Sequence, residues 1–188
     1  KDRFRSRIVS CFIYISARFE IYTDKLNTNP VMKLDELGYT HELEIFKTEQ
    51  QLEKFEIGRV IAEHKERYIV RTAEKELEAE ITGNLRYTAE SREDFPAVGD
   101  WVALTIYDED SAIIQQILPR FSILKRQAAG HSGEIQLIAA NIDYALILQS
   151  VDRDFNINRL ERYLTICYAA KVQPAVVLSK TDLLPSEE

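Results

Sequence analysis

A nearly continuous apolar run over residues 142–150 is the feature that most constrains how this chain can fold. A run without polar alternation is typical of a parallel strand that is buried on both faces of a sheet. Apolar residues then recur at helical spacing over residues 157–170, and either Asn156 or Asn158 can cap the start of that helix. A second apolar strand is predicted over residues 175–179. Strand, helix and strand in this order predict a βαβ unit with a right-handed crossover.

The second of these strands ends in Ser179-Lys180-Thr181-Asp182, which resembles the Asn-Lys-x-Asp motif by which GTPases read guanine. Guanine presents N1–H and an exocyclic amino group side by side, and one carboxylate can accept both hydrogen bonds. The resemblance implies that Asp182 accepts them, that Lys180 packs over the base, and that Ser179 supports the loop in place of the usual Asn. Ligands of open α/β sheets bind at the carboxyl ends of the strands, where this motif lies. The alternative is an ordinary strand-to-helix turn with Thr181 or Asp182 as its cap.

Residues 57–118 carry five short segments of alternating or β-branched apolar residues, with no helical pattern between them. The predicted strands cover residues 57–63, 67–73, 77–82, 99–106 and 111–118. Five short strands separated by turn residues predict a small barrel of the OB type, a fold that commonly binds oligonucleotides. Trp101 lies in the fourth strand. There it either stacks on a base or, as is more frequent for a Trp at the centre of a strand, packs in the core.

Charge gives little support to nucleic-acid binding by this barrel. Residues 57–118 hold seven basic and thirteen acidic residues, and the whole chain has a formal net charge of −7. Neutralisation of phosphates supplies most of the affinity for nucleic acids, so a binding surface usually shows a basic stripe. The candidates for RNA contact are the arginines that could share one face of the barrel, namely Arg59, Arg67, Arg71 and Arg86.

The remaining segments are assigned by composition. We expect residues 32–56 to form a helical lead-in, residues 119–134 a linker, and residues 135–188 the start of an α/β domain.

Residues 1–31 hold six basic and three acidic residues, a net charge of +3, and precede the only Met, Met32. We interpret them as an atypical extension that is upstream sequence and not native. An amphipathic extension and a targeting segment are the alternatives. Their apolar centre is far shorter than the about 20 residues of a membrane span, so no membrane contact is predicted.

The inventory of reactive side chains predicts neither a metal site nor a catalytic centre within these residues. Cys11 and Cys167 are the only cysteines, and they form no Cys-x-x-Cys pattern or Cys/His cluster. None of the three histidines has a Ser, Cys or acidic partner at a spacing typical of a nucleophilic triad.

Several separated segments, in the right order, resemble the RsgA (YjeQ/EngC) family of bacterial small-ribosomal-subunit-dependent GTPases. They are residues 58–61, 90–102, 139–143, 155–164 and 179–182. The resemblance implies a circularly permuted GTPase, in which an OB barrel comes first, the guanine motif second, and the phosphate loop and switch regions afterwards. A cysteine/histidine zinc domain ends the chains of that family.

The phosphate loop itself is missing from this sequence. None of the six glycines is followed by Lys, so no Gly-x-x-x-x-Gly-Lys-Ser/Thr pattern exists to hold phosphates and Mg²⁺. We therefore expect an N-terminal fragment, β plus α/β in class, that ends within a truncated P-loop-type GTPase domain and lacks hydrolysis. Mg²⁺ and Zn²⁺ are expected only through the missing C-terminal part.

The resemblance also implies the ligands and partners. They are GTP and GDP, the small ribosomal subunit and its rRNA, with the protein acting as a cytoplasmic monomer in late subunit maturation. The alternative is a stand-alone OB-fold module that binds RNA or protein and has no nucleotide chemistry.

Overall fold

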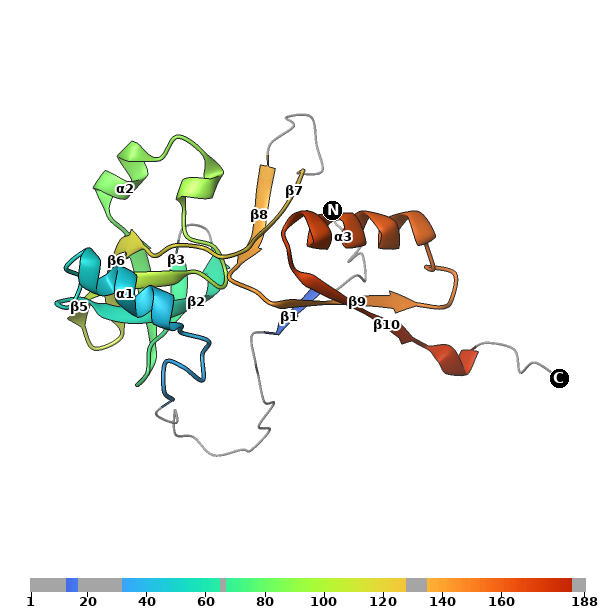
Figure 1. Ribbon diagram of the computed structural model, residues 1–188, viewed down its shortest axis with the longest axis horizontal. Helices are drawn as coiled ribbons and strands as arrows, with labels where there is room; N and C mark the ends of the chain where they lie inside the picture. The colour runs from blue at the N-terminus through green and yellow to red at the C-terminus, as the bar shows by residue number, and fades with distance from the viewer. Residues whose placement is uncertain (1–12, 17–31, 65–66, 128–134, 184–188) are drawn as a thin grey trace, which may run out of the picture.

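The computed structural model describes residues 13–16, 32–64, 67–127 and 135–183 of the chain. These residues form a closed β-barrel and a smaller α/β part, with a two-stranded hairpin between them (Figure 1). The barrel lies at one end of the molecule and the α/β part at the other (Figure 1). The predicted fold class, an OB-type barrel followed by a first βαβ unit, is confirmed.

Five strands close the barrel in the order β2-β3-β4-β6-β5. Their bounds are β2 Glu56–His64, β3 Arg67–Arg71, β4 Glu76–Ile81, β5 Trp101–Asp108 and β6 Ser111–Ile117. Neighbouring strands run antiparallel except β4 and β6, which run parallel, and β5 pairs with β2 to close the barrel. Each strand begins and ends within two residues of its prediction. The alternating pattern therefore located these strands correctly.

The strand β4 shows why these residues form a barrel. Leu77, Ala79 and Ile81 point inward and are buried, whereas the glutamates between them are exposed. Successive side chains of a strand lie on opposite faces, so this alternation fixes which face is the core. The buried residues join Val70 and Ile114 from neighbouring strands in one hydrophobic cluster. A shift of register by one residue would place three carboxylates in the core. The high cost of burying them favours the observed pairing.

The lead-in covers one side of the barrel. Its only helix, α1 (His41–Glu49), is shorter than the predicted span of residues 32–56. Leu37, Leu43 and Leu52 pack with Trp101 in a second hydrophobic cluster. The Trp101 side chain is fully buried, and the ring of Tyr39 contacts it edge-on at 5.0 Å between centroids. Trp101 is therefore a core residue, and the alternative that it stacks on a base is wrong.

Two short helical turns between β4 and β5 contradict the prediction that no helix interrupts the barrel strands. They are α2 (Gly83–Thr88) and the 3-10 turn η1 (Arg92–Asp94). The Thr82 hydroxyl caps α2 by accepting a hydrogen bond from the backbone N–H of Leu85 at 3.1 Å. Neither turn is long enough to show a helical period in the sequence, which is why the pattern missed them.

The α/β part confirms the predicted βαβ unit. Its elements are β9 (Tyr144–Ser150), α3 (Ile157–Ala169) and β10 (Gln173–Ser179), and β9 and β10 pair in parallel. Asn156 caps α3, because its side chain accepts a hydrogen bond from the backbone N–H of Arg159 at 2.9 Å. On its other edge β9 pairs antiparallel with β1 (Ile13–Ser16), which lies within the extension predicted for residues 1–31. The rest of that extension lies outside the described residues.

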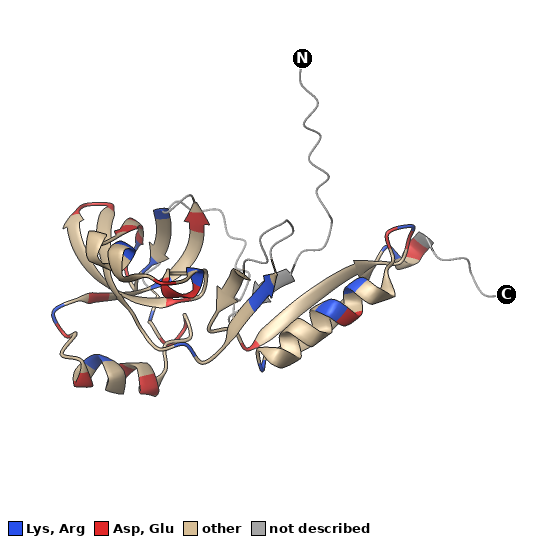
Figure 2. Ribbon diagram, turned by 90° about the horizontal axis from the view of Figure 1, so that it is seen from above, with Lys and Arg blue, Asp and Glu red and all other residues tan. Residues whose placement is uncertain are grey.

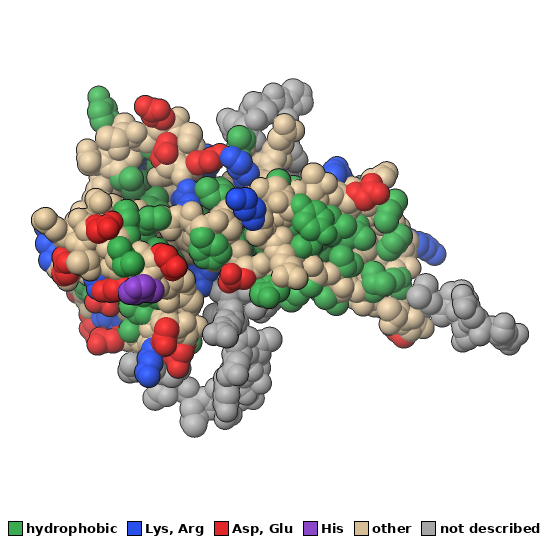
Figure 3. Space-filling model, viewed as in Figure 1, with side chains coloured by type: hydrophobic (Ala, Val, Ile, Leu, Met, Phe, Trp, Pro, Cys, Tyr) green, Lys and Arg blue, Asp and Glu red, His purple; other side chains and the backbone are tan. Residues whose placement is uncertain are grey.

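The strands β7 (Ile123–Gln127) and β8 (Ile135–Ala140) form a hairpin, and β7 lies within the linker predicted for residues 119–134. The middle of β7 is too polar to read as a strand by itself. The open end of the hairpin is buried, however, since Leu124 and Ala139, which pair with each other there, belong to the hydrophobic cluster of the α/β part. Further hydrophobic side chains lie exposed on that part (Figure 3), including Ile157 and Tyr168 of α3.

Candidate functional site

The motif at residues 179–182 lies at the carboxyl edge of the parallel pair β9 and β10. Ser179 is the last residue of β10 and lies opposite Ser150, the last residue of β9. The pairing continues one step further, because the backbone N–H of Val151 donates to the carbonyl of Ser179 at 3.1 Å. The loop after β9 and the motif after β10 therefore lie side by side, at the edge where open α/β sheets bind their ligands.

Lys180 has an unusual backbone conformation at this edge. Its φ is +59°, in the left-handed region that residues with a side chain rarely adopt. The chain turns there from β10 into the 3-10 turn η2 (Thr181–Leu183). The Lys180 ammonium reaches back across to the neighbouring loop, where it forms an ion pair and a hydrogen bond with the carboxylate of Asp152.

Asp152 is itself held in place by two further donors. Its Oδ1 accepts a hydrogen bond from the hydroxyl of Ser150 at 2.9 Å and one from the backbone N–H of Asp154 at 3.0 Å. The Lys180 hydrogen bond, followed by these two contacts, lowers the pKa of Asp152 to about 2. The same pair raises the pKa of Lys180. Both groups are therefore charged at neutral pH, and their contact joins the two loops.

A buried glutamine shapes the loop after β9. The Gln149 side chain is almost fully buried, and its amide donates at 3.1 Å to the carbonyls of both Ser150 and Asp154. One side chain thus holds the two ends of the turn that carries Asp152. Sequence reasoning missed Gln149, Ser150 and Asp152. The only signal was a polar residue near the end of the apolar run at residues 142–150.

Asp182, the residue predicted to read guanine, lies exposed in η2 directly after Lys180 and Thr181. Thr181 is exposed as well, whereas Ser179 is partly buried at the end of β10. The four predicted residues are consecutive and occupy one corner of the α/β part. The structure thus presents the Asp182 side chain to solvent, where a ligand can reach it.

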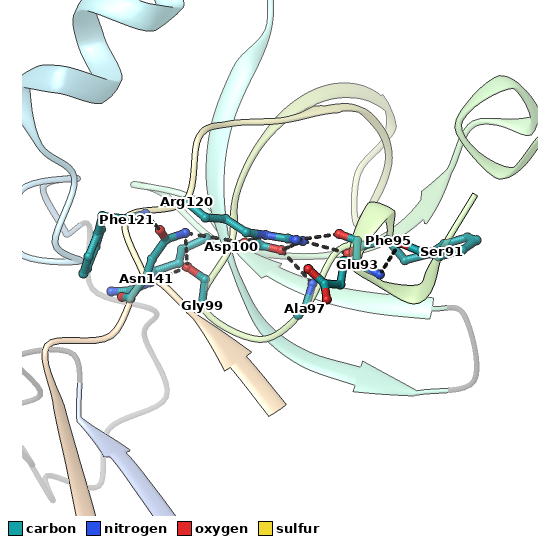
Figure 4. Close-up of polar contacts among 10 residues, drawn as sticks. Ser91, Glu93, Phe95, Ala97, Gly99, Asp100, Arg120, Phe121 and Asn141 are labelled. Atoms are coloured by element: carbon teal, nitrogen blue, oxygen red, sulfur yellow. Dashed lines mark hydrogen bonds and ion pairs between the residues drawn. The ribbon is translucent and has the colours of Figure 1, made fainter. Parts of the chain in front are cut away.

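A second polar cluster joins the barrel to the α/β part (Figure 4). Arg120, which follows β6, donates from Nε and Nη2 to the two carboxylate oxygens of the fully buried Asp100, at 2.8 and 2.6 Å. Asn141, which follows β8, accepts a hydrogen bond from the backbone N–H of Phe121 at 3.0 Å and donates to the carbonyl of Gly99 at 3.2 Å. These contacts connect the end of the hairpin with the start of β5.

The four arginines predicted to contact RNA have different surroundings. Arg59 is buried, and its guanidinium donates to the carbonyls of three residues of the chain, Leu37, Gly99 and Asn141. Arg71 is also buried and lies 3.8 Å from the carboxylate of Glu76. The burial of Arg59 and Arg71 is a correction to their place among the candidates for RNA contact, because a buried guanidinium does not meet a phosphate backbone.

Arg67 and Arg86 are exposed, so RNA contact stays a prediction for these two. Arg67 already forms ion pairs with Glu78 and Glu80 of the neighbouring strand. Acidic and basic positions are interspersed over the described part of the barrel (Figure 2). The described barrel residues therefore form no continuous stripe of positive charge for a nucleic acid.

Within the described ranges, no group of three or more His, Cys, Asp or Glu side chains is placed to hold a metal ion. No described helix is long and apolar enough to cross a membrane.

Comparisons with known proteins agree with the geometry. A family model described as RsgA GTPase matches residues 117–188. The chain is 45% identical over 128 residues to small ribosomal subunit biogenesis GTPase RsgA 1 of Oceanobacillus iheyensis, covering 68% of the chain and 36% of that relative. It is 39% identical over 142 residues to small ribosomal subunit biogenesis GTPase RsgA of Opitutus terrae, covering 71% of the chain and 39% of the relative. The chain thus spans less than half the length of these relatives.

Solved structures support the fold. The crystal structure of YloQ, described as a circularly permuted GTPase, matches with a TM-score of 0.51 and 23% identity, over 70% of this chain and 43% of that one. YjeQ from Thermotoga maritima matches with the same TM-score and 20% identity. The sequence identities to these relatives, together with the family model that matches residues 117–188, lead to one conclusion. The chain belongs to the RsgA GTPase family.

Proposed function

We propose that this chain is the N-terminal part of a ribosome-biogenesis GTPase, which binds GTP and the small ribosomal subunit and acts late in subunit maturation. The observation that carries this proposal is the position of residues 179–182 at the carboxyl edge of β9 and β10, with Asp182 exposed. The family and the names of the matching relatives support it.

The base would be read by the four residues of the motif. The Asp182 carboxylate accepts hydrogen bonds from N1–H and the exocyclic amino group of guanine. Adenine offers no such pair of donors on that edge, which gives the preference for guanine. The aliphatic stem of Lys180 packs on the base plane, and the Ser179 hydroxyl supports the loop with fewer hydrogen bonds than an Asn would give.

Hydrolysis needs groups that these residues do not supply. The phosphate loop of GTPases cradles the β- and γ-phosphates with backbone amides and a Lys and holds Mg²⁺ with a hydroxyl. This sequence lacks that pattern. The chain therefore contributes base recognition and the barrel, while GTP turnover, Mg²⁺ and Zn²⁺ depend on residues outside it.

The barrel is the part that we assign to the small ribosomal subunit, with Arg67 and Arg86 as candidate contacts to its RNA. Because the barrel is acidic, direct phosphate contact by these two arginines contributes only part of the affinity. The competing function is a stand-alone OB-fold module that binds RNA or protein without a nucleotide. The acidity of the barrel and the exposed position of its remaining arginines are compatible with either function.

Hydrolysis assays separate the two functions. We expect purified residues 1–188 to show no measurable GTP turnover. The same chain extended by the residues encoded after Glu188 should hydrolyse GTP, and added small ribosomal subunits should stimulate it. ATP should not replace GTP. Appreciable GTP turnover by residues 1–188 would refute the proposal that hydrolysis depends on residues outside this chain. An extended protein that neither binds nor hydrolyses GTP would favour the binding module.

A further inference from the structure

Two independent features restrain the side chain of Lys180. Its backbone is held in the left-handed conformation, which is rare for a residue with a Cβ and is concentrated at functional sites. Its ammonium is held by Asp152, which comes from the loop after the neighbouring strand. The four-carbon stem between the two fixed ends consequently has far fewer conformations than a free surface lysine.

The partner that fixes the ammonium is well anchored. Asp152 accepts hydrogen bonds from the Ser150 hydroxyl and the Asp154 backbone, and the buried Gln149 amide holds the same turn from the inside. The backbone N–H of Phe155 also donates to the carbonyl of Asp152 at 2.9 Å. An exposed ion pair normally contributes little because two mobile side chains must be ordered to form it. Here the carboxylate is already ordered, so the restraint falls on the lysine.

We propose that Asp152 is a positioning residue for base recognition: it holds the Lys180 stem in the orientation that packs on guanine. This inference rests on the proposed function, because it assigns the specificity of that same motif. Asp152 does not touch the nucleotide. It acts by ordering Lys180 before binding, so that less conformational entropy is lost when the base arrives.

Asp154 supplies the matched control. It lies on the same exposed turn and contributes to the electrostatic field at Lys180, but its hydrogen bond to Asp152 comes from its backbone N–H and not from its carboxylate. Asp154→Asn therefore removes one negative charge from the turn and keeps the Lys180–Asp152 contact. Asp152→Asn removes the same charge together with the contact.

A double-mutant cycle tests the inference by the dissociation constants of GDP and ADP, measured with the extended protein that carries the phosphate loop. Asp152→Asn should weaken GDP binding about fivefold, the upper range for an ion pair of this exposure, and leave ADP binding unchanged. Asp154→Asn should change GDP binding less than about twofold. In a Lys180→Met background, which keeps an apolar stem but no ammonium, Asp152→Asn should have no further effect.

Three outcomes would overturn the inference. The first is that Asp152→Asn weakens GDP binding no more than Asp154→Asn does. The second is that Asp152→Asn weakens GDP binding in the Lys180→Met background as much as it does in the wild type, which would indicate a structural role of the turn. In both, a wild-type preference for GDP over ADP would leave the proposed function intact. The third is a wild-type protein without that preference, which overturns the proposed function as well. If thermal unfolding shows that Asp152→Asn does not fold, Ser150→Ala replaces it. This variant removes one hydrogen bond to Asp152 and should weaken GDP binding about twofold.

Discussion

Replacing Arg120 with Met tests whether the polar cluster between the barrel and the α/β part holds the barrel together. The Arg120 side chain is 11% exposed and makes two hydrogen bonds to the carboxylate of Asp100, which is completely buried. It also donates to the carbonyls of Glu93 and Phe95 at 2.5 and 2.8 Å. The methionine fills a similar volume but leaves a buried carboxylate and two carbonyls without these partners. Removal of one partner of a buried ion pair costs about 3–5 kcal/mol, which is the loss we expect at pH 7.

The loss should depend on pH in a defined direction. Burial raises the pKa of Asp100 above its usual value, and the hydrogen bonds and charge of Arg120 oppose that rise. Without Arg120 these two lowering effects disappear, so the pKa of Asp100 in the folded variant rises further. A folded pKa above the unfolded value of about 3.9 means that the folded state binds more protons in that window. Stability of the variant therefore falls as the pH rises through this window, and part of the loss is recovered when the pH is lowered from 7 toward the unfolded pKa of about 3.9.

Urea unfolding followed by tryptophan fluorescence measures this directly, because Trp101 is the only Trp and lies buried in the barrel. Arg126→Met is the matched control, since Arg126 is exposed and its guanidinium donates to the side-chain oxygen of Gln136. It should change the free energy of unfolding by less than about 0.5 kcal/mol. A loss below about 1 kcal/mol for Arg120→Met, or an equal loss at pH 7 and at about pH 4, would show that Arg120 does not stabilise the buried Asp100 carboxylate.

Three further predictions concern other elements. Asn156→Ala removes the cap of α3 and should lower the free energy of unfolding by about 1 kcal/mol, whereas Asn158→Ala, inside the helix, should not; equal losses in chemical denaturation would contradict the cap. The Asp152 carboxyl should titrate in an NMR pH series near its pKa of about 2. Its contribution to stability is therefore present above the unfolded pKa and is lost as the pH falls toward 2. Titration near 4 would exclude the Lys180 ion pair. Gly99→Ala should destabilise the barrel by at least about 2 kcal/mol, because φ is +94° and a Cβ would lie 2.0 Å from a carbonyl oxygen of β8. Gly83→Ala, whose Cβ meets nothing within 4 Å, is its control and should be nearly neutral.

Local periodicity was sufficient to predict the elements whose burial is regular. In β4 every second residue is buried, and β9 is apolar along most of its length, so each pattern identifies a strand without knowledge of its neighbours. The motif at residues 179–182 could be located because the apolar run before it predicts a strand, and the carboxyl end of a parallel strand lies at the edge of its sheet. These predictions needed only the chain segment itself.

Contacts between distant segments could not be predicted in this way. Arg59 looked like a surface residue of a barrel strand, yet its guanidinium is satisfied by the carbonyl of Asn141, 82 residues away. The hairpin strand β7 is polar in its middle and is stabilised by pairing with β8 across residues outside the described ranges. Asp152 became visible as a partner of Lys180 only when the parallel register brought the two loops together. In each case the deciding energy comes from a partner that the local sequence does not contain.

A swap of the base tests whether Asp182 reads guanine. In the extended protein, Asp182→Asn replaces a carboxylate that accepts two hydrogen bonds with an amide that accepts one and donates one. Xanthine carries a carbonyl where guanine carries its amino group, so the variant should lose affinity for GTP and gain it for xanthosine triphosphate. We expect the ratio of the two dissociation constants to reverse, with thermal stability unchanged. An unaltered preference for GTP in the folded variant would contradict the claim.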